Sequence, residues 1–105
     1  MKDEDAAWPP NWVPTPIDTS DIELPAALRP LIEQLAENAH DNWAELRLSE
    51  GWQWGSTTEP TTKRHKLLVP YAELSEQDKE SDRRLAIETL KLVLHFGFRI
   101  ELGDG

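Results

Sequence analysis

Apolar residues recur every three or four positions over residues 28–46, and this spacing predicts a helix that buries one face. The stripe consists of Leu31, Ile32, Leu35, Ala36, Ala39, Trp43 and Leu46. Pro25 suits a first helical turn, whereas Pro30 does not suit a helix interior. We therefore expect a short turn at residues 25–29 and the main helix from about Pro30. Gly51 predicts the end of this helix, in the left-handed conformation.

A second helix is predicted from Ser75, which stands three residues before Asp78 in an arrangement that resembles a capping box. The helix is expected to run to about Phe96, with Gly97 as its stop. Its first half is charged, and its second half is apolar on more than one side. We therefore expect the second half to form the centre of the core. Its apolar residues are Leu85, Ala86, Ile87, Leu90, Leu92, Val93, Leu94 and Phe96.

The segments outside these two helices lack a helical period. Residues 8–16, WPPNWVPTP, hold four prolines and predict an extended, polyproline-like arm. Such an arm could be a ligand for another domain, but more often it lies along its own core, with Trp8 and Trp12 as plugs. Residues 1–7, MKDEDAA, are expected to form an acidic flexible tail, which leaves residues 8–105 as a single domain.

Shorter elements are expected between and after the helices. The turn-rich stretch at residues 55–60 makes a short hairpin possible within residues 52–66. Residues 67–71, LLVPY, are extended by their proline and apolar enough to be buried. Apolar and polar residues alternate from Phe98 onward, which predicts a short final strand, and Phe98 itself can fold back on the last helical turn.

The composition restricts the possible partners. The chain of 105 residues has a formal net charge of −9, which disfavours duplex nucleic acid. No apolar run approaches the ~18 residues of a membrane span, and no basic amphipathic helix is apparent, so no membrane partner is expected. The sequence contains no cysteine and begins without an apolar signal core, so we expect a cytoplasmic protein.

Two tryptophans follow the first helix directly. Trp52 and Trp54 are two residues apart, so in an extended segment their rings point the same way. A flat base could stack on that shared face, which contributes roughly 1–3 kcal/mol per ring. In the alternative interpretation, one or both rings fill the core beneath the loop.

A cationic cluster follows in the same loop and consists of Lys63, Arg64, His65 and Lys66. Concentrated positive charge in an acidic chain suits a phosphate, which arginine holds with two hydrogen bonds and lysine as a point charge. The alternative is a solvated loop that offsets the acidic helices. Arg47 lies one turn after Trp43 and could either reach a ligand over this loop or pair with Glu50 or Glu37.

The sequence contains few of the residue patterns that are typical of catalytic or metal-binding sites. His40-Asp41 is similar to the metal pair of HD phosphohydrolases, but only His65 and His95 remain as further histidines. We therefore expect His40 to be a hydrogen-bonding residue at the helix flank and no metal site or cofactor. No nucleophile motif, phosphate-binding glycine loop or catalytic carboxylate pair is present, so we expect no enzyme.

Five short motifs carry a family resemblance: LAEN at residues 35–38, HDNWA at 40–44, GWQWG at 51–55, LVPY at 68–71 and TLK at 89–91. In this combination and order the chain resembles the RyR domain. That domain is the repeat first described in ryanodine receptors, and it is also found as single copies in bacterial and phage proteins.

The resemblance implies an α+β fold, mostly α, with two antiparallel helices, a proline-rich N-terminal arm and short strands or loops. It implies no known enzymatic activity, and prokaryotic members look like ligand-sensing modules, with nucleotide-derived ligands suggested in anti-phage settings. The receptor repeats occur in tandem pairs, so a single copy could form a homodimer. This chain differs from the family pattern at Trp54, where a tyrosine is usual, and at Lys66, where a proline is usual.

From the residues and the resemblance together, we expect a non-enzymatic module that binds a small anionic, nucleotide-derived molecule, as a sensor or a sponge. The base would stack on Trp52 or Trp54, and the phosphates would meet Lys63, Arg64 or Lys66. Arg47, His65 and Tyr71 would supply supporting contacts. The alternative is a protein–protein interaction or packing module with no small ligand.

Overall fold

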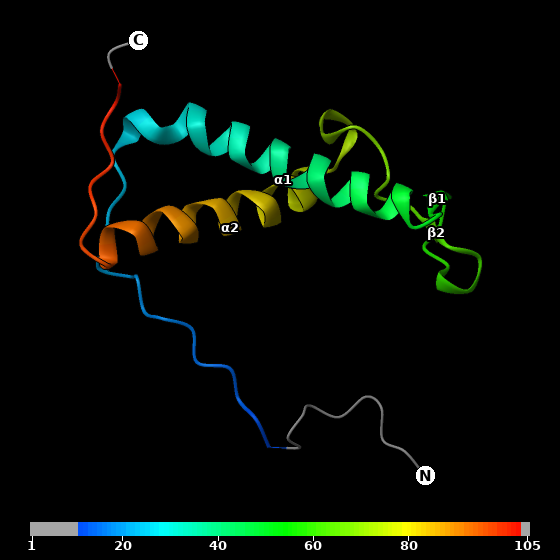
Figure 1. The fold of residues 1–105 in the computed structure, drawn as a ribbon, viewed down its shortest axis with the longest axis horizontal. Coiled ribbons are helices and arrows are strands. Elements are labelled where there is room, and N and C mark those ends of the chain that lie inside the picture. Colours follow the sequence, from blue (N-terminus) through cyan, green and yellow to red (C-terminus); the bar gives the residue numbers. More distant parts are fainter. Residues whose placement is uncertain (1–10, 104–105) are drawn as a thin grey trace.

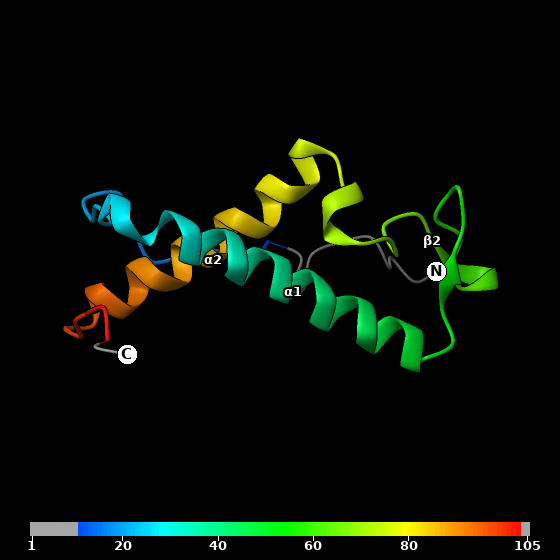
Figure 2. The ribbon, with the colours of Figure 1, turned by 90° about the horizontal axis from the view of Figure 1, so that it is seen from above.

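Two long helices dominate the computed structural model, which describes residues 11–103. They are α1 (Arg29–Ser49) and α2 (Glu76–His95). The helices run antiparallel and cross at an angle, as the two perpendicular views show (Figures 1 and 2). The expected α+β class with mostly helical content is confirmed. The predicted acidic tail at residues 1–7 and the ring of Trp8 lie outside the described residues.

The helix boundaries follow the local signals in the sequence. A short 3₁₀ turn, η1 (Ala26–Leu28), precedes α1, as the two prolines predict. Ser75 is the N-cap of α2, because its hydroxyl oxygen accepts a hydrogen bond from the backbone N–H of Asp78 at 3.1 Å. This bond satisfies one of the N–H groups that a helix start leaves free.

Both helices end at a glycine with the same backbone pattern. Gly51 and Gly97 each have φ of +93°, a conformation that favours glycine. The N–H of Trp52 bonds to the carbonyl of Arg47 at 3.0 Å, and the N–H of Phe98 bonds to the carbonyl of Val93 at 3.1 Å. These six-residue closures are Schellman motifs, so both predicted stops are confirmed.

The loop after α1 contains a two-stranded ladder rather than a hairpin. Strands β1 (Gln53–Trp54) and β2 (Arg64–His65) pair in parallel. The chain turns back between them through η2 (Pro60–Thr62) and through Lys63, which has φ of +56°. Glu59 and Arg64 form an isolated antiparallel bridge that closes the tight turn. Strand β2 then runs parallel to β1. The loop therefore contains two paired strands, as a hairpin would, but these strands run parallel instead of antiparallel.

The core lies at the middle of α1 and not on α2. The buried apolar side chains among residues 11–103 are Ala36, Tyr71 and Leu74, and the half-buried Leu67 and Val69 pack against them. The loop from β2 and the 3₁₀ turn η3 (Tyr71–Glu73) bring these residues onto α1. The expectation that the second half of α2 forms the core centre is wrong, since no described residue of α2 is fully buried. That half is only partly covered, by α1 and by residues 19–26, and its Leu85 stays exposed.

Two expectations for the ends of the chain are also wrong. Trp12 is 55% exposed and Val13 is exposed, so Trp12 does not plug the core, and the arm leads away from the helices (Figure 1). Residues 98–103 form no strand, because no described strand lies beside them to complete a ladder. Phe98 folds back on the last helical turn through its backbone N–H, which bonds to the carbonyl of Val93, but its side chain is exposed. Neither long helix carries an apolar stretch sufficient to cross a membrane within the described residues.

Candidate functional site

The parallel register decides which predicted side chains meet. Gln53 is paired with Arg64, and Trp54 is paired with His65. Paired residues of a ladder present their side chains on the same face, and neighbours along a strand alternate between faces. Trp54 and His65 therefore share one face of the ladder with Trp52, which we call the aromatic face.

Arg64 lies on the opposite face of the ladder. Its guanidinium donates a hydrogen bond to the side-chain oxygen of Gln53. Gly55 follows on that side, and a Cβ atom placed there would be 2.8 Å from the Cβ of Arg64. The glycine thus permits the close approach of β2 to β1. The predicted arrangement, with both tryptophans and Arg64 around one hollow, is divided between two faces.

Aromatic rings form a continuous row from α1 across the aromatic face. The ring of His65 lies 4.8 Å from that of Trp43, edge to face, and 5.9 Å from that of Trp52. Trp52 is half-buried, whereas Trp54 is 55% exposed. The two tryptophans therefore differ: Trp52 is partly a packing residue, and Trp54 offers an open indole surface.

His65 is a neutral centre of this row rather than a member of a cationic cluster. Its Nδ1 accepts a hydrogen bond from the backbone N–H of Leu67 at 3.1 Å, which requires that nitrogen to be unprotonated. Burial lowers the pKa of His65, and the charges of Arg47 and Lys66 lower it further. At neutral pH the imidazole therefore contributes packing and an Nε2–H donor instead of positive charge.

The remaining cations of the predicted cluster have separate roles. Lys63 donates from Nζ to the carbonyl oxygen of Glu50 at 2.8 Å, so its charge meets the negative end of α1. The side chain of Lys66 is exposed, and its charge is close enough to His65 to lower the pKa of that ring. Arg47 forms an ion pair with Glu50 at 2.7 Å, and its Cζ lies 6.0 Å from the centre of the Trp52 ring. The predicted pairing of Arg47 with Glu50 is therefore confirmed.

Tyr71 belongs to the core. It is buried, and its hydroxyl donates to Oε2 of Glu33 at 3.0 Å. Burial raises the pKa of Tyr71, and the bond to Glu33 raises it further. The hydroxyl is directed to the ion-pair network between the helices, so Tyr71 supports the loop from within.

A pocket of about 340 Å³ adjoins the aromatic face. Its lining consists of His40, Trp43, His65, Leu67, Leu74, Asp78, Ser81 and Asp82. Trp43 and His65 are common to this pocket and to the aromatic row, so the two regions are continuous. Burial raises the pKa of Asp82 on the α2 side of the pocket.

Trp43 is a site residue that the periodicity assigned to the helix stripe alone. It lies one helical turn before Arg47, and this spacing is the signal that would have placed it beside the site. His40, one turn earlier, is buried and donates from Nε2 to the carbonyl oxygen of Val69 at 2.7 Å. The predicted hydrogen-bonding role of His40 is therefore confirmed. No three His, Asp or Glu side chains converge as a metal ion would require within the described part of the chain.

The family model of the RyR domain matches residues 12–102, which is nearly the whole chain. The matched range includes both long helices, the two-stranded ladder and every residue of the aromatic face.

Proposed function

The chain belongs to the RyR domain family, and on this basis we propose that it is a non-enzymatic module that binds a small anionic molecule derived from a nucleotide. The observation that carries the proposal is the open indole of Trp54 on the same ladder face as Trp52 and His65. An exposed indole offers a π surface to any nucleobase, and stacking of one base contributes about 1–3 kcal/mol.

The charges around the aromatic face orient such a ligand. Arg47 and Lys66 are close enough to it to act on Trp52 or His65, whereas Asp78 and Asp82 line the pocket that His65 shares. In our proposal the phosphates lie toward Arg47 and Lys66, because like charge at the two aspartates repels them. The base then stacks on Trp54 and the accessible part of Trp52. Lys63, Arg64 and Tyr71 have other partners and are left out of this refined site.

A titration with mononucleotides, cyclic nucleotides and dinucleotides tests the proposal, with tryptophan fluorescence and calorimetry as readouts. Trp54→Ala should weaken the best binder at least about tenfold, which corresponds to the loss of one stacked base. Trp12→Ala is the matched control, because Trp12 is also 55% exposed but stands on the N-terminal arm. Failure of every nucleotide to bind more tightly than about 1 mM would refute the proposal. Equal losses in the two variants would refute the assignment to Trp54.

A second candidate function is a packing module that joins another protein chain, including a second copy of itself. It is supported by the contrast between three buried apolar side chains and the long series of exposed ones in residues 11–103. The larger of these exposed side chains include Leu46, Leu48, Trp54, Leu85, Phe96 and Phe98. Contact with another chain would remove such side chains from water.

Light scattering with and without nucleotide separates the two candidates. A packing module has the mass of a dimer in the absence of ligand, and Trp52→Ala or Leu85→Ser lowers that mass while nucleotides change nothing. A ligand-binding module responds to nucleotide in fluorescence whatever its mass. In either case we propose a cytoplasmic location, with which the complete lack of cysteine is compatible.

A further inference from the structure

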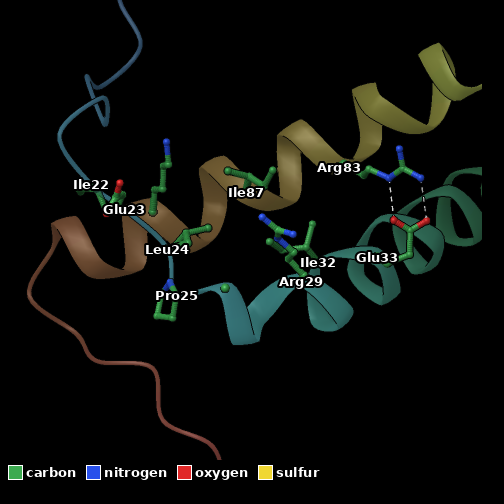
Figure 3. Close-up of a pocket in the computed structure, with 11 residues that line it drawn as sticks. Ile22, Glu23, Leu24, Pro25, Arg29, Ile32, Glu33, Arg83 and Ile87 are labelled. Atoms are coloured by element: carbon green, nitrogen blue, oxygen red, sulfur yellow. Dashed lines mark hydrogen bonds and ion pairs between the residues drawn. The ribbon is translucent and has the colours of Figure 1, made fainter.

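A second hollow of about 490 Å³ lies at the other end of α1 from the aromatic face (Figure 3). It forms where residues 22–26 approach α1 and pass beside α2. Its lining consists of Ile22, Glu23, Leu24, Pro25, Ala26, Arg29, Ile32, Glu33, Arg83, Ile87 and Lys91. We call it the strap pocket, after the strap formed by residues 19–25. Its volume is within the range of about 300–1,000 Å³ that is typical of small-molecule sites.

The walls of the strap pocket are apolar. Figure 3 shows Leu24 on the strap, Ile32 on α1 and Ile87 on α2 around the same space. Arg83, Ile87 and Lys91 follow one another at four-residue intervals, so α2 presents one stripe to the pocket. An apolar ligand body placed there would remove these side chains from water, at about 25 cal/mol per Å² of apolar surface.

The pocket is preorganised because the strap is held at both ends. Thr19 is only 5% exposed, and its hydroxyl donates to Oε1 of Glu88 on α2 at 2.8 Å. At the other end the strap continues into η1, where the N–H of Leu28 bonds to the carbonyl of Pro25 at 3.0 Å. The Glu33–Arg83 ion pair joins α1 to α2 beside the pocket, as the dashed lines in Figure 3 show. A ligand would therefore meet walls that are already in position.

The charges of the pocket favour an anion. Arg83 is compensated by Glu33, and further by Glu76 and Glu80. Arg29 and Lys91 form no ion pair with any other residue in the described range 11–103. Glu23 is the only other carboxylate in the lining, so the lining has three cations and two carboxylates. This excess of positive charge contrasts with the net charge of −9 for the chain.

We propose that the strap pocket binds a small amphipathic anion, with an aromatic or branched aliphatic body and a single carboxylate. The body lies between Leu24, Ile32 and Ile87, and the carboxylate meets Arg29 and Lys91 at the mouth. This site does not depend on the aromatic face, since none of its lining residues belongs to the ladder.

The probe pair that tests the proposal is naphthoate and naphthamide, which have the same ring system and differ in charge. Titrated into the full chain, naphthoate should shift the methyl resonances of Ile22, Leu24, Ile32 and Ile87 in a saturable manner. Naphthamide should bind about tenfold more weakly, because it lacks the charge that Arg29 and Lys91 recognise. Methyl shifts elsewhere, equal binding of the two probes, or no saturation by either probe would overturn the proposal.

Charge variants sharpen the test. Arg29→Gln combined with Lys91→Gln should reduce the affinity for naphthoate about tenfold and leave that for naphthamide unchanged. Arg84→Gln is the matched control, since Arg84 is also a cation of α2 but does not line the strap pocket. If Arg84→Gln lost as much affinity for naphthoate as the double variant, the probe would be attracted to surface charge in general, and the proposed site would be refuted. Leu24→Trp, which fills the pocket, should abolish binding of both probes.

The outcome is separable from that of the proposed nucleotide site. Binding at the strap pocket moves the isoleucine methyl resonances, whereas a nucleotide on Trp54 changes the indole signals. Trp54→Ala should leave the affinity for naphthoate within about twofold of the unmodified chain.

Discussion

The carboxylate of Glu33 on α1 and the guanidinium of Arg83 on α2 form an ion pair with two parallel hydrogen bonds. The distances are 2.7 Å from Nε to Oε1 and 3.1 Å from Nη2 to Oε2. The pair joins the two long helices next to the small core, and the hydroxyl of Tyr71 bonds to the same carboxylate. In a fold with few buried apolar side chains, this bridge is a principal link between the helices.

Arg83→Gln should lower the stability of the fold more than Arg99→Gln, because among residues 11–103 Arg99 pairs only with the exposed Glu101. The bonds to Arg83 hold the pKa of Glu33 below its usual value near 4.5. This contribution is therefore present above that pH and is lost as the pH falls through the folded pKa. Thermal unfolding followed by circular dichroism should show a Tm difference near neutral pH that shrinks as the pH is lowered below 4.5. A constant difference at all pH values would contradict this account.

The lowered pKa of His65 predicts that the folded chain loses stability in mild acid. Burial lowers its pKa in the folded chain below the usual value of 6.5. The unfolded chain therefore takes up the proton first as the pH falls, so the free energy of unfolding declines below about pH 6.5 until the folded pKa is reached. Urea midpoints measured over this range should fall for the unmodified chain and remain level for His65→Phe. His95→Gln is the control and should keep the decline, since His95 is exposed at the end of α2.

Gly55→Ala should disturb the ladder through a contact and not through backbone strain. The added Cβ would lie 2.8 Å from the Cβ of Arg64, a separation that forces β1 and β2 apart. Overpacking of this kind costs about 1–3 kcal/mol, measurable as a lower urea midpoint and a changed tryptophan emission. Gly103→Ala is the comparison, because nothing lies within 4 Å of a Cβ at that position. Similar effects of the two changes would contradict the close approach of the strands.

Tyr71→Phe separates stability from binding. Loss of the hydroxyl bond to Glu33 should cost about 0.5–1.5 kcal/mol of unfolding free energy, with the ring still in the core. Because that hydroxyl is directed to the helix bridge, the affinity for the best nucleotide of the panel should not change. A change of more than about threefold in this affinity, with the fold intact, would indicate that Tyr71 does contact the ligand.

The features that depend on local chemistry were predictable from the sequence. Ser75, Gly51 and Gly97 mark helix boundaries because each acts on backbone groups only a few residues away. The second half of α2 was not predictable in the same way. Its apolar composition indicates burial, but actual burial depends on how fully other elements cover it, and α1 and residues 19–26 leave every residue of α2 at most half-buried. The strand predicted from Phe98 onward does not form for a similar reason, because an alternating segment becomes a strand only beside a partner strand.

In the candidate site too, features set by neighbouring residues were predictable, and features set by longer-range pairing were not. The alternation of Trp52 and Trp54 along the chain predicted a shared face; in the structure Trp54 is paired with His65, and the ring of His65 lies 5.9 Å from that of Trp52. The position of Arg64 on the opposite face follows from the parallel register with Gln53, which depends on how residues 55–63 turn back. Trp43 was hidden within a regular helical stripe, because a core position and a site position have the same periodicity.

The two identical helix endings have a consequence for engineering. Trp52 and Phe98 each occupy the position after the terminal glycine, with the same backbone bond to the preceding helix. Trp52 meets the ring of His65, whereas Phe98 is 68% exposed. The backbone alone therefore forms the second ending. A polar residue in place of Phe98 should leave the fold intact and reduce self-association during purification, which would make crystallisation of the single chain easier.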